Sequence, residues 1–240
     1  MKKIKIIIVL FLFLLLSSCG IKGELHTEEE LREYTDDLIC NPRTEQKCDL
    51  KNKYILEKIL EKNEEDREVD KRTLLLKLKG LDLEFETTSS LHCTETFDAT
   101  CTEEEYQMTS NYSEKIFEYY ITEYEKIINY NERLCYEINR NNETKCDIDS
   151  FVINNKEELN YFIEFYKGLL NYLNNQEYKV PTHIISINIK SNNRTYYLSL
   201  GIELLDNQYY PIYESSNVPL DGNIETYIDN YLYKEGIQLN

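Results

Sequence analysis

The chain has 240 residues, with 44 acidic against 27 basic side chains and a formal charge of −17. Nucleic acid is excluded as a partner, because phosphate contacts need clustered Lys and Arg, and the longest basic feature, Lys71-Arg72, is flanked by acidic residues. Direct adsorption to an anionic bilayer is disfavoured for the same reason.

The first residues form a charged start followed by an apolar run. Lys2, Lys3 and Lys5 precede an uncharged apolar stretch over 6–16. This stretch is shorter than the roughly 20 residues that a membrane-spanning helix needs, and small residues follow it. The pattern is typical of an export signal that is removed from the mature protein.

The residues at the end of this signal carry a resemblance to a known class. Leu16, Ser17, Ser18 and Cys19 match, in order, the lipobox of bacterial lipoproteins. The resemblance implies a signal peptide over 1–18, a diacylglycerol on the Cys19 thiol and a lipidated tether over 19–26. The residue after Cys19 is Gly20 rather than Asp, which resembles lipoproteins that are sorted to the outer membrane. The alternative is an ordinary secretory signal cut at a nearby small residue.

The next elements follow from capping and periodicity. Thr27 and Glu30 fit a capping box, which predicts a helix to about Ile39. A second helix is expected after Asp49, with its apolar side formed by Tyr54, Ile55, Ile59 and Leu60. Alternation of apolar and charged residues over 73–86, interrupted by Gly80, predicts a bent strand or a hairpin.

Helices and strands then alternate towards the C-terminus. The capping-box pattern recurs at 102–105, ahead of a long helix predicted over 111–134. A further helix is expected over 156–174, then strands near 185–189, 196–202 and 209–213, with a turn at Asn192 and Asn193 and a last helix from Ile224. The fold class is therefore α+β, with several amphipathic helices packed with a small antiparallel sheet. One domain over 27–240 is expected, and a subdivision near 88–110 stays open.

Six further cysteines form three local pairs in the sequence. We expect local disulfides within these pairs, although the sequence alone does not fix the connectivity: Cys40 with Cys48, Cys93 with Cys101, and Cys135 with Cys146. A zinc site is the rival interpretation, but His26, His92 and His183 lack the close spacing that zinc ligands show.

The helix over 156–174 has an unusually wide apolar face. Tyr161, Phe165 and Tyr172 extend its apolar stripe to more than half of the circumference. One hypothesis is that these three rings line a groove that binds a peptide or another apolar ligand. The other is that the sheet covers one side of the helix and the long helix covers the other.

The sequence contains no nucleophile elbow, glycine-rich phosphate loop or zinc-hydrolase motif. It therefore predicts no catalytic residue, metal or cofactor. We expect a lipid-anchored protein of the cell envelope, in the outer membrane, that acts as a binding or structural module. Its partners would be the membrane, through the anchor, and a peptide, protein or apolar ligand. The alternative is an envelope hydrolase with a carboxylate pair in an acidic cleft.

Overall fold

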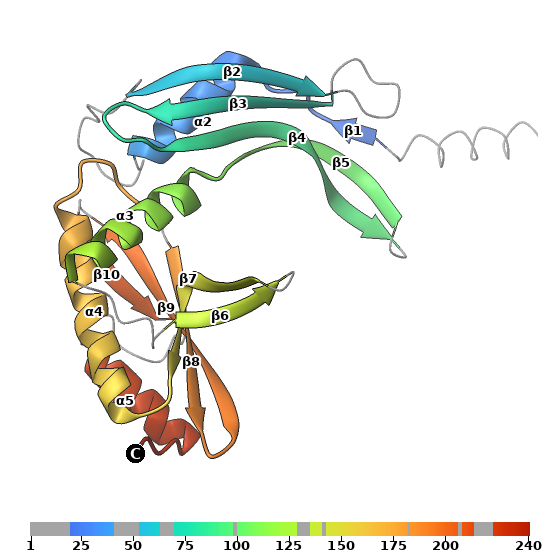
Figure 1. The fold of residues 1–240 in the computed structure, drawn as a ribbon. Coiled ribbons are helices and arrows are strands. Elements are labelled where there is room, and N and C mark those ends of the chain that lie inside the picture. Colours follow the sequence, from blue (N-terminus) through green and yellow to red (C-terminus); the bar gives the residue numbers. More distant parts are fainter. Residues whose placement is uncertain are drawn as a thin grey trace, which may run out of the picture. The chain divides into compact units, whose positions relative to one another are not determined.

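The structure is a computed structural model. It describes residues 20–40, 53–62, 70–97, 100–128, 135–140, 143–181, 183–205, 208–213 and 223–240. The chain forms two compact units, each with its own sheet (Figure 1). The main boundary lies between Tyr112 and Ser113, and the end of the first helix, from Leu38, belongs to the second unit. The sequence predicted one domain, and the division lies just beyond the region 88–110 where a subdivision was left open.

The first unit combines most of one helix with a five-stranded sheet. The strands lie in the order β1-β5-β4-β3-β2, and every pair is antiparallel except β1 with β5, which is parallel. The elements are β1 (Gly20–Lys22), α2 (Glu28–Cys40), β2 (Tyr54–Lys62), β3 (Lys71–Leu78), β4 (Glu84–Phe97) and β5 (Thr100–Ser110).

The β3–β4 hairpin confirms the alternation that the sequence shows. Leu74, Leu76 and Leu78 are buried on one face of β3, as a half-buried strand requires. Gly80 lies in the turn with a φ of +88°, a left-handed conformation that glycine adopts without steric cost. Local chemistry therefore defines this hairpin.

One predicted helix is a strand, and a second capping-box pattern also lies in a strand. The residues expected to form a second helix are β2, which pairs with β3. The register shifts between Leu56 and Lys58, and this bulge brings Leu56 and Ile59 to one face of the strand. A bulged strand therefore repeats its apolar residues at a spacing that imitates a helix. The capping-box pattern at 102–105 likewise lies in β5, paired with β4.

The first capping box is confirmed. The Thr27 backbone N–H donates to Glu30 Oε2 at 2.7 Å, and the Glu30 N–H donates back to Thr27 Oγ1 at 3.2 Å. The helix that starts here packs on the sheet, where the Thr35 and Thr87 hydroxyls lie 2.9 Å apart. Both hydroxyls are buried, so their hydrogen bond satisfies two polar groups that water cannot reach.

The second unit has a second five-stranded sheet, in the order β10-β9-β8-β7-β6. Its β7–β8 pair is parallel and is joined through α4, whereas the other pairs are antiparallel. The elements are α3 (Tyr112–Ile128), β6 (Cys135–Arg140), β7 (Glu143–Ile153), α4 (Lys156–Asn174), β8 (His183–Ser191), β9 (Arg194–Leu205), β10 (Gln208–Tyr213) and α5 (Ile224–Glu235).

Most elements of the second unit agree with the prediction. Asn155 caps α4 by accepting a hydrogen bond from the Glu158 N–H. Asn192 and Asn193 both have positive φ, 49° and 59°, as the tight turn between β8 and β9 requires. Within the helix predicted over 111–134, α3 covers Tyr112–Ile128, and residues 129–134 lie outside the described part of the chain.

The α+β class is confirmed, but the sheet differs from the expectation. The sequence predicted one small antiparallel sheet, whereas the structure has two sheets that each contain a parallel pair. The parallel pairs were missed because they join residues far apart in the chain. Such pairing leaves no periodic signal within either segment.

The capping box predicts a measurable loss of stability. We expect Thr27→Ala to lower the free energy of unfolding by about 1 kcal/mol, because the N-terminal amides of α2 lose their side-chain acceptor. Thr102→Ala is the matched control, since the same pattern lies in a strand there. Urea unfolding of both variants measures the difference, and equal losses would contradict the assignment.

Candidate functional site

The predicted anchor adjoins the first sheet directly. Cys19 lies outside the described residues, but the next residue, Gly20, begins β1 and pairs with Glu103 of β5. Ile21 and Lys22 continue the parallel pairing opposite Glu104 and Glu105. The segment predicted as a tether over 19–26 is therefore a strand in its first described residues.

The remaining residues before α2 are also held against the sheet. Gly23 turns with a φ of +77°, and the His26 N–H then donates to Ser89 Oγ at 3.2 Å. The His26 ring nitrogen Nδ1 lies 2.9 Å from the same oxygen, and Arg72 donates to the His26 carbonyl at 2.5 Å. Sequence patterns do not predict these contacts, because they join residues that are 46 and 63 positions apart in the chain.

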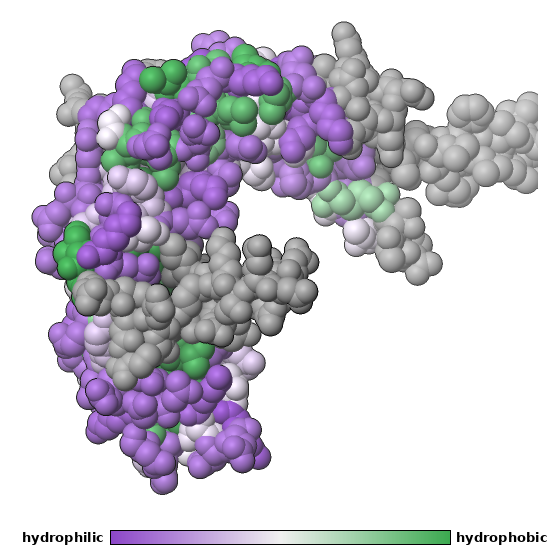
Figure 2. All heavy atoms as spheres, in the orientation of Figure 1, coloured by the Kyte–Doolittle hydropathy of each residue, from purple (hydrophilic) through white to green (hydrophobic). Residues whose placement is uncertain are grey.

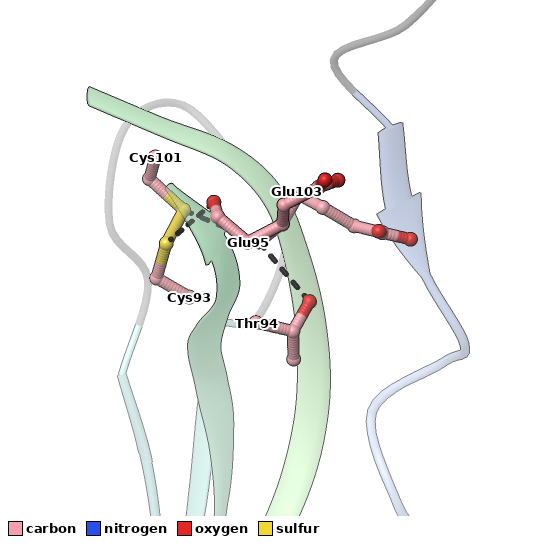
Figure 3. The surroundings of a disulfide bond; sticks show 5 residues. All are labelled: Cys93, Thr94, Glu95, Cys101 and Glu103. Carbon is pink, nitrogen blue, oxygen red and sulfur yellow. Dashed lines mark hydrogen bonds between the residues drawn. A yellow bond between two sulfur atoms is a disulfide. The ribbon is translucent and has the colours of Figure 1, made fainter. Parts of the chain in front are cut away.

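A disulfide closes the hairpin beside β1. Cys93 of β4 and Cys101 of β5 are bonded, with their Cα atoms 5.8 Å apart, which confirms the predicted local pair (Figure 3). Glu103, opposite Gly20 on one side of β5, pairs with Glu95 of β4 on the other. The predicted anchor therefore adjoins a hairpin end that is covalently closed.

The other predicted disulfides are described in part. Cys40 at the end of α2 is disulfide-bonded, while its expected partner Cys48 lies outside the described residues. Cys135 and Cys146 lie on the adjacent strands β6 and β7, where Cys146 pairs with Glu137, two residues from Cys135. Bonding within the third pair stays a prediction.

This end of the sheet is strongly acidic. Glu95, Glu103, Glu104 and Glu105 lie within a few residues of one another on the paired strands β4 and β5. Glu95 and Glu103 are directly opposite, an arrangement that destabilises a strand pair through like-charge repulsion. A surface of this sign repels an anionic bilayer.

The wide aromatic face of α4 is covered by α3. Phe165 is 3% exposed, and its ring lies 5.5 Å from Tyr124 and 5.1 Å from Phe151 of β7. Tyr172 also contacts Tyr124, with ring centroids 5.4 Å apart, and Tyr161 interacts electrostatically with the same phenol. The geometry therefore favours the core interpretation over a groove lined by Tyr161, Phe165 and Tyr172.

The opposite side of α4 packs on the second sheet. Phe162 lies 5.0 Å from Phe151, and the Tyr166 hydroxyl donates to the Gly201 carbonyl at 2.9 Å. The helix is thus covered on two sides, as its apolar width demands.

A glycine allows α3 to lie this close to α4. A Cβ built on Gly168 would lie 1.8 Å from the Tyr124 hydroxyl oxygen and 3.0 Å from Cζ of the same ring. Gly168 belongs to the stripe of Tyr161, Phe165 and Tyr172 at helical spacing. A glycine within an aromatic stripe is the signal that could have revealed this contact from the sequence.

Burial shifts the pKa of several groups in the second unit. Desolvation raises the pKa of the Glu125 carboxyl on α3 to about 7. Burial also raises the pKa of the Tyr120 and Tyr209 phenols, and it lowers the pKa of the Lys179 ammonium. The Tyr209 hydroxyl accepts from the Val180 N–H at 2.5 Å and donates to the Val180 carbonyl at 3.2 Å, which fixes the ring between strand and loop.

The described residues contain no group of three His, Cys, Asp or Glu placed to hold a metal ion. No helix in the described part of the chain is long and apolar enough to cross a bilayer. Comparison with known proteins finds no matching family model, no similar curated protein and no similar solved structure.

The contact between α3 and α4 predicts an unusual response to alanine. Ala is favoured over Gly by about 1 kcal/mol inside a helix, but Gly168→Ala should lower the free energy of unfolding by about 1–3 kcal/mol through the clash. Adding Tyr124→Phe, which removes the hydroxyl, should recover part of this loss. Urea unfolding of the single and double variants measures the coupling. A higher melting temperature for Gly168→Ala alone would contradict the packing.

The raised pKa of Glu125 predicts that replacing this residue stabilises the protein in a pH-dependent way. Because its folded pKa is raised, the folded state binds more protons than the unfolded state between pH 4.5 and about 7, and stability falls as the pH rises through this window. Glu125→Gln should therefore raise the urea midpoint at about pH 8 and leave it nearly unchanged at about pH 4. Glu164→Gln, at a side chain that is 78% exposed, is the control. A similar gain in both variants would contradict burial as the cause.

Proposed function

We propose that this protein is a lipid-anchored protein of the bacterial cell envelope that acts as a binding or structural module. The lipobox residues Leu16 to Cys19 support the anchor. The Cys93–Cys101 disulfide and the bonded Cys40 support an oxidising compartment outside the cytoplasm. The proposed location is the outer membrane, from the identity of Gly20.

One observation carries this proposal: the first residue after Cys19 is already paired in the sheet. With Gly20 opposite Glu103, a lipid on Cys19 would hold the β1–β5 edge at the bilayer surface. The β3–β4 turn lies at the other end of the sheet, about 30 Å along β4 from Cys93 at 3.3 Å per residue. The first unit would thus have one end at the membrane and one end facing away from it.

The charge of the chain is consistent with this arrangement. Without residues 1–18, which hold three lysines and no acid, the formal charge becomes −20. Electrostatic attraction cannot hold such a body on an anionic surface, whereas two or three acyl chains give stable attachment. The proposed partners, beyond the membrane, are a peptide, a protein or an apolar ligand, and not nucleic acid.

Removing the thiol of Cys19 tests the proposal. Mass spectrometry of the native protein should find an amino terminus at Cys19 that carries an acyl mass, and globomycin should block this processing. Cys19→Ser should abolish the acyl mass and release the protein from the membrane fraction.

The double variant Cys93→Ser/Cys101→Ser is the matched control, because it removes cysteines that are bonded elsewhere in the chain. It should retain both the acyl mass and the membrane attachment. A native protein without acyl mass, or a Cys19→Ser protein that stays in the membrane fraction, would contradict the proposal.

A further inference from the structure

Among the strands that the structure describes, β2 stands at one edge of the first sheet. It pairs with β3 on one side, and β3 is its single neighbour in the strand order (Figure 1). Figure 2 shows hydrophobic residues among hydrophilic ones at the surface over β2. Three apolar residues of this strand are exposed: Ile55 at 52%, Leu60 at 40% and Ile59 at 38%.

The edges formed by other described strands are shorter or blocked. β1 has three residues and β6 has six, whereas β2 has nine. The edge strand β10 contains Pro211, which has no backbone N–H to donate to a further strand. β2 contains no proline, so among the described edge strands it offers the longest template for pairing with another strand.

The bulge in β2 places its apolar residues in two matched pairs. Ile55 and Leu60 lie opposite Lys77 and Thr73 of β3, which are four residues apart and share one face of the sheet. Leu56 and Ile59 lie opposite Leu76 and Leu74, on the other face. In a regular strand without this bulge, the two members of each pair, which are an odd number of residues apart, would point to opposite faces.

Two copies of β2 can lie antiparallel so that the apolar residues of one pair with those of the other. When a second β2 is placed alongside by a two-fold axis perpendicular to the sheet, Ile55 faces Leu60 of the second copy on one face. Leu56 faces Ile59 of the second copy on the other face. In the same register Glu57 lies opposite Lys58 of the second copy, twice in the symmetric pair.

The charge of the strand also suits a second copy. β2 carries two Glu and two Lys and is neutral, whereas the whole chain carries −17. Charged residues on an edge strand normally prevent pairing, but in this register Glu57 and Lys58 of the two copies meet with opposite charge. Glu61 lies opposite Tyr54, and Lys62 at the end of the strand lies opposite Lys53, so the charge match is confined to the centre of the pair. Because β2 is neutral, it adds no net charge of its own to the repulsion between two acidic chains.

We propose that β2 pairs antiparallel with β2 of a second copy of this chain, in the register that sets Glu57 against Lys58. The two sheets then form one continuous sheet across two chains. Cross-strand apolar pairs and two symmetric ion pairs stabilise this interface. The inference does not depend on the lipid anchor, because every contact lies within β2.

Charge reversal tests the register. Full-length protein, extracted in a density-matched detergent, should show a monomer–dimer equilibrium in analytical ultracentrifugation. Glu57→Lys and Lys58→Glu should each weaken dimerisation about ten-fold or more, since each variant replaces two attractive pairs with two repulsive ones. The double variant Glu57→Lys/Lys58→Glu should restore the wild-type equilibrium, because the pairs regain opposite signs.

The control is Glu164→Lys, which makes the same change of charge on α4 and should leave dimerisation unchanged. Circular dichroism melts establish that each variant folds. A protein that is monomeric at every concentration would overturn the proposal and would indicate that the bulge and charges protect the edge. A dimer that is insensitive to the single reversals, or not restored by the double variant, would also overturn it.

Discussion

The parallel pairing of β1 with β5 determines how the proposed lipid anchor would orient the first unit. A lipoprotein whose first residues are a free tether can orient its domain in many ways. Here the residue after Cys19 is fixed opposite Glu103. The lipid and the sheet would then behave as one body, with the disulfide-closed hairpin at the membrane. The proposed arrangement would tolerate the acidic residues of β5, because the acyl chains rather than charge would supply the attachment.

The two units bury their apolar surfaces in different ways. In the first unit one helix covers one face of a sheet whose edge strand β2 keeps apolar residues exposed. In the second unit α4 is covered twice, by the sheet through Phe162 and by α3 through Tyr124. The proposed contacts with other molecules therefore all lie on the first unit, at opposite edges of its sheet: the lipid at β1 and a second copy at β2.

Local chemistry explains which elements the sequence predicts. Several features depend only on residues that are close together in the sequence. They are the capping box of Thr27 and Glu30, the cap at Asn155, and the turn at Asn192 and Asn193. The alternation around Gly80 is equally local, and so is the pairing of Cys93 with Cys101 across a hairpin end. Each of these features agrees with the structure.

Features that depend on distant residues were not predictable in this way. The bulge at Glu57 is defined by pairing with β3, and without that partner the spacing of Ile55 and Ile59 indicates a helix. The aromatic face of α4 indicated either a groove or a core, and only the position of Tyr124 on α3 distinguishes them. The β1–β5 pairing joins segments some 80 residues apart, so three residues that form a strand resembled a tether.

Hydrogen exchange of the membrane-attached protein tests the central claim most directly. If β1 is paired with β5, the strand Gly20–Lys22 should show slowed amide exchange, with protection comparable to that of its partner residues Glu103 to Glu105. Exchange of this segment at the rate of an unstructured peptide, while β5 stays protected, would show that Cys19 is joined to the sheet by a free tether. That result would contradict the proposed orientation of the first unit at the bilayer.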